Sequence, residues 1–310
     1  MIYTVTLNPA IDRTIIVPTL NVGSVNRTIS SDSYVGGKGI NVSKVLKVLG
    51  AKSTALGFLG KENSQVFIDF FEEQKIDNNF NFVSGENRIN IKLIERDREV
   101  ITDINENGFI VTEDDIQKFT DRLVKTANEG DIVVLAGSLP KGVNTDIYKQ
   151  LIQSLNKKNV KTILDASKNA LMLGIEAIPY AAKPNVHELC DIVNIDANDE
   201  DSIISGGRKI LDMGVKKLLI SMGDKGSIYL SKEKALYANP IKVDVKNTVG
   251  AGDSMVAALT YGINKGLCDE DTLKLAAACG TAAVIKSGTE PPDADAIESI
   301  SNNIKINRLV

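Results

Sequence analysis

The sequence predicts an α/β fold in which helices cover both faces of a mostly parallel sheet. Short runs that are apolar throughout alternate with amphipathic helical runs along most of the 310 residues. Because crossover helices bury a parallel sheet on both sides, continuous apolar strands separated by helices indicate this arrangement. No internal repeat, low-complexity tract or proline-rich linker divides the chain, so we expect a single domain spanning residues 1–310.

Three strands and three helices are expected in the first half of the chain. In order, they are a strand at 2–7, a helix at 41–49, a strand at 54–59, helices at 65–74 and 112–128, and a strand at 132–136. The strands are short apolar runs, whereas the helices repeat apolar residues every three or four positions. Gly50 ends the first helix, and Thr112 with Asp115 forms an acidic variant of the capping box before the third.

The second half continues the alternation and closes on helices. In order, we expect a helix at 146–157, a strand at 161–164, a helix at 203–213, a strand at 217–222, and helices at 254–265, 271–286 and 293–303. The same two periodicities distinguish strands from helices here.

Two segments interrupt this rhythm, near residues 12–36 and 88–103. The second contains the strand-like runs 89–94 and 100–103 with no helix between them. We interpret both segments as hairpin-like strands outside the main sheet, forming a small β lid over it.

Composition and charge exclude several classes of function. The chain carries 36 Lys and Arg against 40 Asp and Glu, a net charge of −4 that supplies no global attraction to nucleic acid or membrane. The single histidine, His187, cannot build a triad or a multi-histidine metal site together with other histidines. Three cysteines without CxxC spacing, and no apolar run near the ~20 residues of a membrane span, favour a cytoplasmic protein.

Polar residues follow the carboxyl ends of several expected strands. They are Asp12, Ser138, Asp165, Asn185 and Asp224. Each alone is an ordinary polar loop residue, but open parallel sheets bind ligands at this edge. Their shared placement therefore predicts a common cleft.

Residues 248–253, Thr-Val-Gly-Ala-Gly-Asp, are the most informative stretch. Gly250 and Gly252 allow a tight turn at a helix start, where free N–H groups and the helix dipole favour an anion. We expect those groups to keep Asp253 ionised, able to remove a proton from a hydroxyl during phosphoryl transfer. The alternative is an aspartate that only caps a helix after a glycine turn.

A second glycine motif, Tyr-Val-Gly-Gly-Lys-Gly-Ile-Asn at 34–41, is neither a Walker A loop nor GxGxxG. It could hold a polyol and a phosphate together. The lid adds the cations Arg27, Arg88 and Lys92, of which the last two share one face of a strand. These cations indicate a phosphorylated substrate, the alternative being solvated charges on an edge strand.

Asn185 and Glu188 lie on one face of a helix that follows Lys183. Their oxygens suit Mg²⁺, which is often held by few protein groups together with phosphates and water. His187 points elsewhere on this helix, and we interpret it as a surface group.

Three motifs, in this order and spacing, resemble the ribokinase-like (phosphofructokinase B type) carbohydrate kinases. They are Gly-Gly-Lys-Gly-Ile-Asn at 36–41, Lys-Pro-Asn-x-x-Glu at 183–188 and Thr-Val-Gly-Ala-Gly-Asp at 248–253. Residues 6–12, 25–27 and 88–92 are similar to the bacterial 1-phosphofructokinase branch. The resemblance covers essentially the whole chain. It implies a ribokinase-like three-layer αβα fold with a small β lid that often forms a dimer contact, with ATP as donor and Mg²⁺ as cofactor.

The resemblance also implies roles for individual residues. Asp253 would be the catalytic base, and Gly250, Ala251 and Gly252 the anion hole. Sugar hydroxyls would bind Asp12, Gly37 and Asn41, and the substrate phosphate Lys38, Arg88, Lys92 and Ser138, with Arg27 reaching it from a partner's lid. The nucleotide site would comprise Lys183, Asn185, Ser221, Gly223, Gly226 and Thr248, with Glu188 ordering Mg²⁺.

One position departs from the family pattern. Asn247 stands where many members have an aspartate close to a monovalent cation, so potassium dependence is left open. Phosphosugar kinases also carry this asparagine.

The implied reaction is phosphorylation of the 6-hydroxyl of fructose 1-phosphate to fructose 1,6-bisphosphate by ATP. Tagatose-6-phosphate kinase is the alternative, although Arg-Ile-Asn-Ile-Lys at 88–92 favours the former. A non-phosphorylated substrate fits poorly with the cations near the cleft. A catalytically silent sugar-phosphate sensor would lack the base, but Asp253 and its flanking glycines are present.

Overall fold

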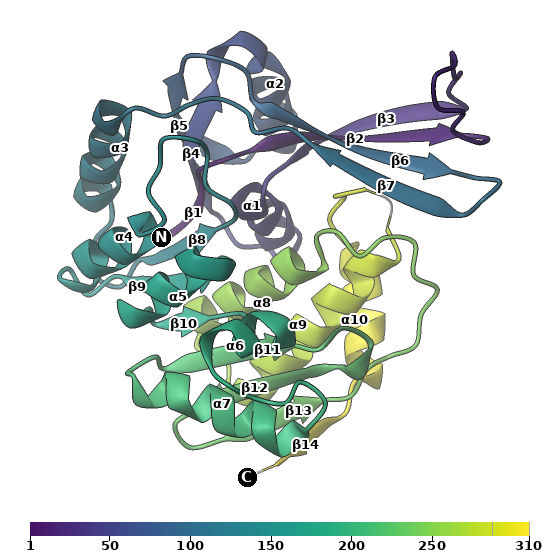
Figure 1. The fold of residues 1–310 in the computed structure, drawn as a ribbon. Coiled ribbons are helices and arrows are strands. Elements are labelled where there is room, and N and C mark those ends of the chain that lie inside the picture. Colours follow the sequence, from purple (N-terminus) through teal and green to yellow (C-terminus); the bar gives the residue numbers. More distant parts are fainter. Residues whose placement is uncertain (287, 310) are drawn as a thin grey trace.

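The computed structural model describes residues 1–286 and 288–309. Within this part of the chain, ten strands form one sheet in the order β14-β13-β12-β11-β10-β9-β8-β1-β4-β5 (Figure 1). These strands are β1 (Ile2–Thr6), β4 (Thr54–Gly60), β5 (Asp77–Val83), β8 (Ile132–Ala136), β9 (Lys161–Asp165), β10 (Ala181–Ala182), β11 (Lys217–Ser221), β12 (Ser227–Ser231), β13 (Ala235–Ala238) and β14 (Ile306–Arg308). The pairing is parallel from β5 to β11 and antiparallel from β11 to β14.

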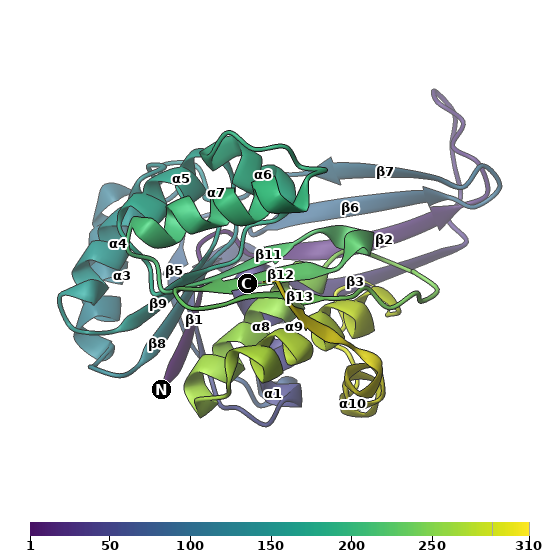
Figure 2. The same ribbon diagram turned by 90° about the horizontal axis from the view of Figure 1, so that it is seen from below.

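Helices cover the two faces of this sheet as separate layers (Figure 2). One face carries α3 (Glu113–Thr126), α4 (Ile147–Asn156), α5 (Lys168–Glu176), α6 (Val186–Ile192) and α7 (Glu200–Asp212). The other carries α1 (Lys38–Val48), α8 (Ala251–Lys265), α9 (Asp269–Val284) and α10 (Ala294–Asn303). Within β8, Val133 and Leu135 pack on the first layer and Ile132 and Val134 on the second, as the alternation of side chains along a strand requires. The predicted three-layer fold class is confirmed.

A second sheet of four strands projects from this body (Figure 1). Its order is β3-β2-β6-β7, with β2 (Ala10–Val17), β3 (Ser30–Gly36), β6 (Arg88–Glu95) and β7 (Val100–Asn105). We call these four strands the lid. Beneath the base of the lid, α2 (Gln65–Gln74) and β5 form a separate apolar cluster that includes Phe67, Phe71 and Phe80.

The helix α5 and the strands β5, β12, β13 and β14 were not predicted from the sequence. The last two strands span only four and three residues, too short for a periodicity to show. β5 reads Asp-Asn-Asn-Phe-Asn-Phe-Val and is polar because one of its sides is an edge of the sheet. Two further turns of 3₁₀ helix, η1 (Lys61–Asn63) and η2 (Gly223–Lys225), complete the described elements.

Candidate active site

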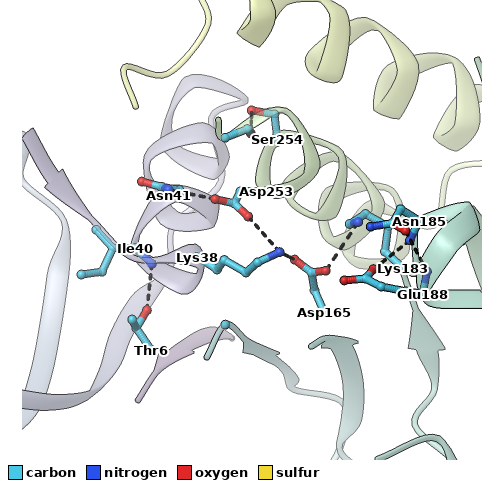
Figure 3. Close-up of polar contacts among 12 residues, drawn as sticks. Thr6, Lys38, Ile40, Asn41, Asp165, Lys183, Asn185, Glu188, Asp253 and Ser254 are labelled. Atoms are coloured by element: carbon cyan, nitrogen blue, oxygen red, sulfur yellow. Dashed lines mark hydrogen bonds and ion pairs between the residues drawn. The ribbon is translucent and has the colours of Figure 1, made fainter. Parts of the chain in front are cut away.

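The candidate active site lies beyond the carboxyl ends of β1, β8, β9 and β10 (Figure 3). Here the first turns of α1 and α8 approach each other, with Lys38 Nζ 3.7 Å from Asp253 Oδ1. Asp165 ends β9 and Lys183 directly follows β10, so both point into the same region. Charged side chains from four separate segments therefore lie together at the carboxyl ends of the strands, where the sequence predicts a common cleft.

The glycine motif at 36–41 allows α1 to start against the end of β1. A Cβ on Gly39 would lie 2.6 Å from both Val5 O and Thr6 Oγ1, too close for any side chain. The backbone N–H of Ile40 donates to Thr6 Oγ1 at 3.0 Å, so a β1 side chain satisfies one of the free N–H groups of the helix start. This close approach places Lys38, the first residue of α1, at the centre of the site.

The turn before α8 has the geometry that its sequence predicts. Gly250 caps the helix at a φ of 84°, in the left-handed region where glycine carries no steric penalty. Ser254 Oγ donates to Gly250 O at 2.9 Å and holds the turn closed. Asp253 consequently sits in the first turn of α8 with its side chain directed toward Lys38.

Four charged residues form an alternating chain across the site (Figure 3). Lys38 Nζ lies 2.8 Å from Asp165 Oδ2 and 3.7 Å from Asp253 Oδ1, and Lys183 Nζ lies 3.5 Å from Asp165 Oδ1. Burial opposes the charge on Lys38, but the carboxylates of Asp165 and Asp253 outweigh it and raise the pKa of Lys38. Burial also acts on Asp165, yet the ammonium groups of Lys183 and Lys38 lower the pKa of its carboxyl.

Asp253 departs from the sequence-based expectation. The expectation was that the amides of the helix start would favour its charge, but burial of the side chain is the largest influence and raises the pKa of its carboxyl. Lys38 opposes this shift, the nearby charge of Asp165 adds to it, and Asn41 Nδ2 donates to Asp253 Oδ2 at 2.8 Å. The pKa is raised because only 6% of Asp253 is exposed and a second carboxylate lies nearby, and the ionised state expected of this carboxylate stays a prediction.

The lid brings its polar face over this region. Asp12 and Asn90 are cross-strand neighbours, and Asn90 Nδ2 donates to Asp12 Oδ1 at 2.8 Å. Arg88 Nη1 donates to Asn90 Oδ1 at 3.4 Å, so the predicted lid residues are connected. A cavity of about 240 Å³ lies beside them, lined by both lid and body residues that include Asp12, Asn90, Lys92, Asn247, Val249 and Thr289. Lys92 is paired with Asp103 of β7 at 3.0 Å.

The residues predicted for a nucleotide gather around β10, β11 and the loop before α8. Asn185 and Glu188 form a reciprocal capping box at the start of α6, in which Glu188 Oε2 accepts from Asn185 N at 2.9 Å. Asn185 also forms an isolated parallel β-bridge with Ser221, the last residue of β11. Gly223 and Gly226 adopt positive φ around η2, and Thr248 O accepts from Ala251 N at 3.4 Å.

Two of the predicted substrate residues, Arg27 and Ser138, are exposed. Arg27 is exposed in the loop that joins β2 and β3 at the far end of the lid. Ser138 is exposed after β8, in a loop anchored by Tyr148, whose hydroxyl donates to Gly137 O at 3.0 Å. His187 is exposed on the first turn of α6, as expected for a surface group.

Two buried residues of the site, Asp165 and Lys44, have no role among the sequence-based predictions. Asp165 was noted only for following a strand, although its carboxylate joins the two lysines. Lys44 was overlooked, and its position three residues after Asn41 on a helix otherwise rich in apolar residues was the available signal.

Comparison with known proteins now identifies the family. A family model for the pfkB family carbohydrate kinases matches residues 5–296. The chain belongs to the pfkB family of carbohydrate kinases. This agrees with the fold and with the cluster of charged residues, to which all three motifs that carry the resemblance contribute.

Similar kinases are known from several bacteria. The 1-phosphofructokinase of Vibrio cholerae is 37% identical over 308 residues, covering 99% of this chain and 97% of that protein. The 1-phosphofructokinase of Bacillus subtilis is 35% identical over 311 residues, covering 100% of this chain and 100% of that protein.

Solved structures of this family share the architecture. Phosphofructokinase-2 from Escherichia coli in complex with potassium matches with a TM-score of 0.91 and 27% identity, covering 97% of this chain and 98% of that one. A tetrameric inhibited form of that protein matches with a TM-score of 0.90 and 26% identity over the same shares. No helix in the described part of this kinase is long and apolar enough to span a membrane.

Proposed function

We propose that this kinase transfers the γ-phosphoryl group of ATP to the 6-hydroxyl of fructose 1-phosphate, giving fructose 1,6-bisphosphate and ADP. The full-length similarity to 1-phosphofructokinases supports this substrate over tagatose 6-phosphate. The observation that carries the proposal is the buried carboxylate of Asp253, held in a helix N-terminal turn within ion-pair reach of Lys38.

In this proposal Asp253 is the catalytic base. Its carboxylate accepts the proton of the attacking 6-hydroxyl, and its raised pKa makes it a stronger base than an ordinary aspartate. Residues Gly250, Ala251 and Gly252 form the anion hole, because N–H groups in the first turn of a helix have no partner inside the helix.

The nucleotide is proposed to bind on the β10–β11 side of the cleft. The residues that would contact it are Lys183, Asn185, Ser221, Gly223, Gly226 and Thr248. Lys183 is 3% exposed and is anchored by Asp165, so its ammonium is oriented before a phosphate arrives.

The residues present fit a magnesium ion held mainly by phosphates and water. Among the described residues, no group of three or more histidine, cysteine, aspartate or glutamate side chains could hold a metal ion. Glu188 supplies one carboxylate, of which Oε2 is used by the capping box. A site with one protein carboxylate suits Mg²⁺, which would neutralise the charge of the ATP phosphates.

The phosphosugar is proposed to bind between the lid and α1. Asp12, Gly37 and Asn41 would contact its hydroxyls, and Lys38, Arg88, Lys92 and Ser138 its phosphate. Because Arg27 lies at the far end of the lid, it would reach a phosphate only in a second copy. We therefore propose a homodimer formed through the lid. We also propose that residues 1–310 form a single kinase domain and that the enzyme acts in the cytoplasm.

A coupled ADP-release assay tests the proposed function directly. Fructose 1-phosphate, fructose 6-phosphate, tagatose 6-phosphate, fructose and ribose would be compared with ATP and Mg²⁺. We expect the highest kcat/KM with fructose 1-phosphate and little turnover of the two unphosphorylated sugars. A higher kcat/KM with tagatose 6-phosphate, or with fructose or ribose, would refute the assignment.

A further inference from the structure

Lys44 is a buried lysine next to the proposed catalytic base. It lies on α1, is 6% exposed, and its ammonium contacts a residue of the same helix, the lid strand β3 and a segment 245 positions further along the chain. Lys44 Nζ donates to Asn41 Oδ1 at 3.1 Å, to Val35 O of the lid at 2.5 Å and to Thr289 O at 3.2 Å. The same ammonium lies 5.2 Å from the centre of the Phe70 ring on α2. All three protons of the ammonium are thus directed to acceptors.

The contact with Asn41 decides which way the amide of that residue points. A lysine ammonium can only donate hydrogen bonds, so the atom of Asn41 that faces it must be the carbonyl oxygen. The amide nitrogen is therefore turned to the other side, where Nδ2 donates to Asp253 Oδ2 at 2.8 Å (Figure 3). Lys44, Asn41 and Asp253 form a directed chain of two hydrogen bonds.

We propose that Lys44 is a positioning residue that locks the Asn41 amide so that its N–H group, and not its oxygen, faces the catalytic carboxylate. Without the ammonium, the amide could rotate and present its oxygen to Asp253, which would disfavour the ionised base. The inference rests on the proposed function, because it assigns Lys44 to the same base. It concerns this helix–helix contact and does not depend on which phosphosugar is phosphorylated.

The same ammonium connects the base to the walls of the sugar-side cavity. Val35 belongs to the lid strand β3, and Thr289 lines the cavity together with Asp12 and Lys92. Asn247 Nδ2 donates to Gly288 O at 2.6 Å, so the segment of Gly288 and Thr289 is held from α1 and from the loop before α8. Displacement of the lid or of this segment would therefore disturb the group that orients Asp253.

Several charges act on this pair of groups. Lys44 faces Asp12, Asp253 and Glu290, and Asp253 also faces Lys38, Asp165 and Lys183. Burial lowers the pKa of Lys44 to about 8 against the attraction of the three carboxylates. A neutral amine can also accept a hydrogen bond, so the orientation of Asn41 is enforced only while Lys44 is protonated. Turnover by the parent protein should decline on the alkaline side as this proton is lost.

The test compares Lys44→Met with Lys44→Arg and with Lys47→Met, an exposed lysine on the same helix. Steady-state kinetics with the phosphosugar and ATP would be measured across the pH range in which each protein is folded. For Lys44→Met we expect kcat to fall about tenfold, the acid limb of the kcat profile to move to higher pH, and KM to change less than kcat. Lys44→Arg keeps a cation that can only donate hydrogen bonds, so the acid limb of its kcat profile is expected to stay at the pH of the parent protein. Lys47→Met should have the kcat and the pH profile of the parent protein.

A kcat for Lys44→Met within about twofold of the parent value would overturn the inference. A lower kcat with an unmoved acid limb of the pH profile would also overturn it, because a merely structural role predicts that result. If Lys44→Met does not fold, Lys44→Gln, neutral and of similar length, is judged by the same criteria. Failure of the proposed function is distinguishable, because the parent protein would then not turn over fructose 1-phosphate.

Discussion

At the scale of single residues, the site contains two buried carboxylates that both lie close to Lys38 and whose pKa values shift in opposite directions. Asp165 is fully buried, and Lys183 and Lys38 together lower the pKa of its carboxyl. Asp253 has one weaker ion pair, at 3.7 Å, and burial raises the pKa of its carboxyl. The carboxyl of Asp165 thus favours the ionised form, whereas that of Asp253 is the more basic of the two, as its proposed role in proton removal requires.

We predict that Asp253→Asn lowers kcat by about 10³-fold with nearly normal ATP binding, because it removes the base but keeps the shape. The same change should stabilise the fold at neutral pH. A raised pKa means that the folded state favours the protonated form, so this contribution is complete below the ordinary carboxyl pKa and is lost as pH rises through the raised value. Thermal unfolding as a function of pH, together with kinetics, checks both effects.

Asp165→Asn is the matched control, and it is expected to change the stability of the fold in the opposite direction. A lowered pKa means that the ionised form stabilises the folded state above the ordinary carboxyl pKa, and that this is lost as pH falls through the lowered value. Removing this charge should destabilise the protein by about 2–3 kcal/mol, at the lower end for a broken buried pair because Lys38 is partly exposed. If both variants shifted stability in the same direction, the electrostatic account of the site would be wrong.

At the scale of elements, the lid contributes a polar face whose residues alternate along β6. Arg88, Asn90 and Lys92 share that face, and Asn90 connects it to Asp12 on β2. Arg88 Nε also donates to Asn8 O at 3.3 Å, so its guanidinium is oriented by the segment that follows β1. Such pre-orientation suits recognition of a phosphate by a planar cation.

For this element we predict that Arg88→Ala raises KM for fructose 1-phosphate by about tenfold or more, with a smaller change in kcat. Lys92→Ala should act in the same direction but less, because Lys92 is already paired with Asp103. Arg96→Ala, eight positions beyond Arg88 and exposed past the end of β6, serves as control. An unchanged KM in both lid variants would exclude the lid from phosphate binding.

At the scale of the whole molecule, the lid is an open sheet without a helix layer of its own (Figure 1). Its outer strand exposes the large apolar side chains of Val100, Ile101 and Ile104. An exposed apolar edge of this kind is a liability in a monomer and a natural surface for a second copy. The lid therefore supports the proposed dimer, in which each Arg27 would serve the other subunit.

We predict that Ile101→Asp combined with Ile104→Asp produces a monomer in sedimentation analysis, with KM for the phosphosugar raised toward that of Arg27→Ala. The control is Ile110→Asp, at an apolar residue that is 64% exposed but lies outside the lid. A dimer that persists in the double variant would show that subunits meet elsewhere.

Much of this molecule could be predicted from the sequence because its signals are local. The turn at Gly250 and the capping box of Thr112 with Asp115 depend on neighbouring residues, and both adopt the expected form. Short strands such as β13 and β14 could not be predicted, since three or four residues carry no periodicity and pair only with strands formed elsewhere. The partners of Asp165 and Lys44 were equally out of reach, because those partners lie up to 245 positions away in the chain.

The sequence by itself determined the fold class, the motifs and the side chains available for chemistry, because helix periods, glycine turns and caps are set within a few residues. The tertiary structure decided which charges meet. It brought Lys38 between two carboxylates, turned the Asn41 amide toward Asp253 and buried the Asp253 side chain, which raises the pKa of its carboxyl. The physical reason is that burial and the distances between charges depend on how distant segments pack.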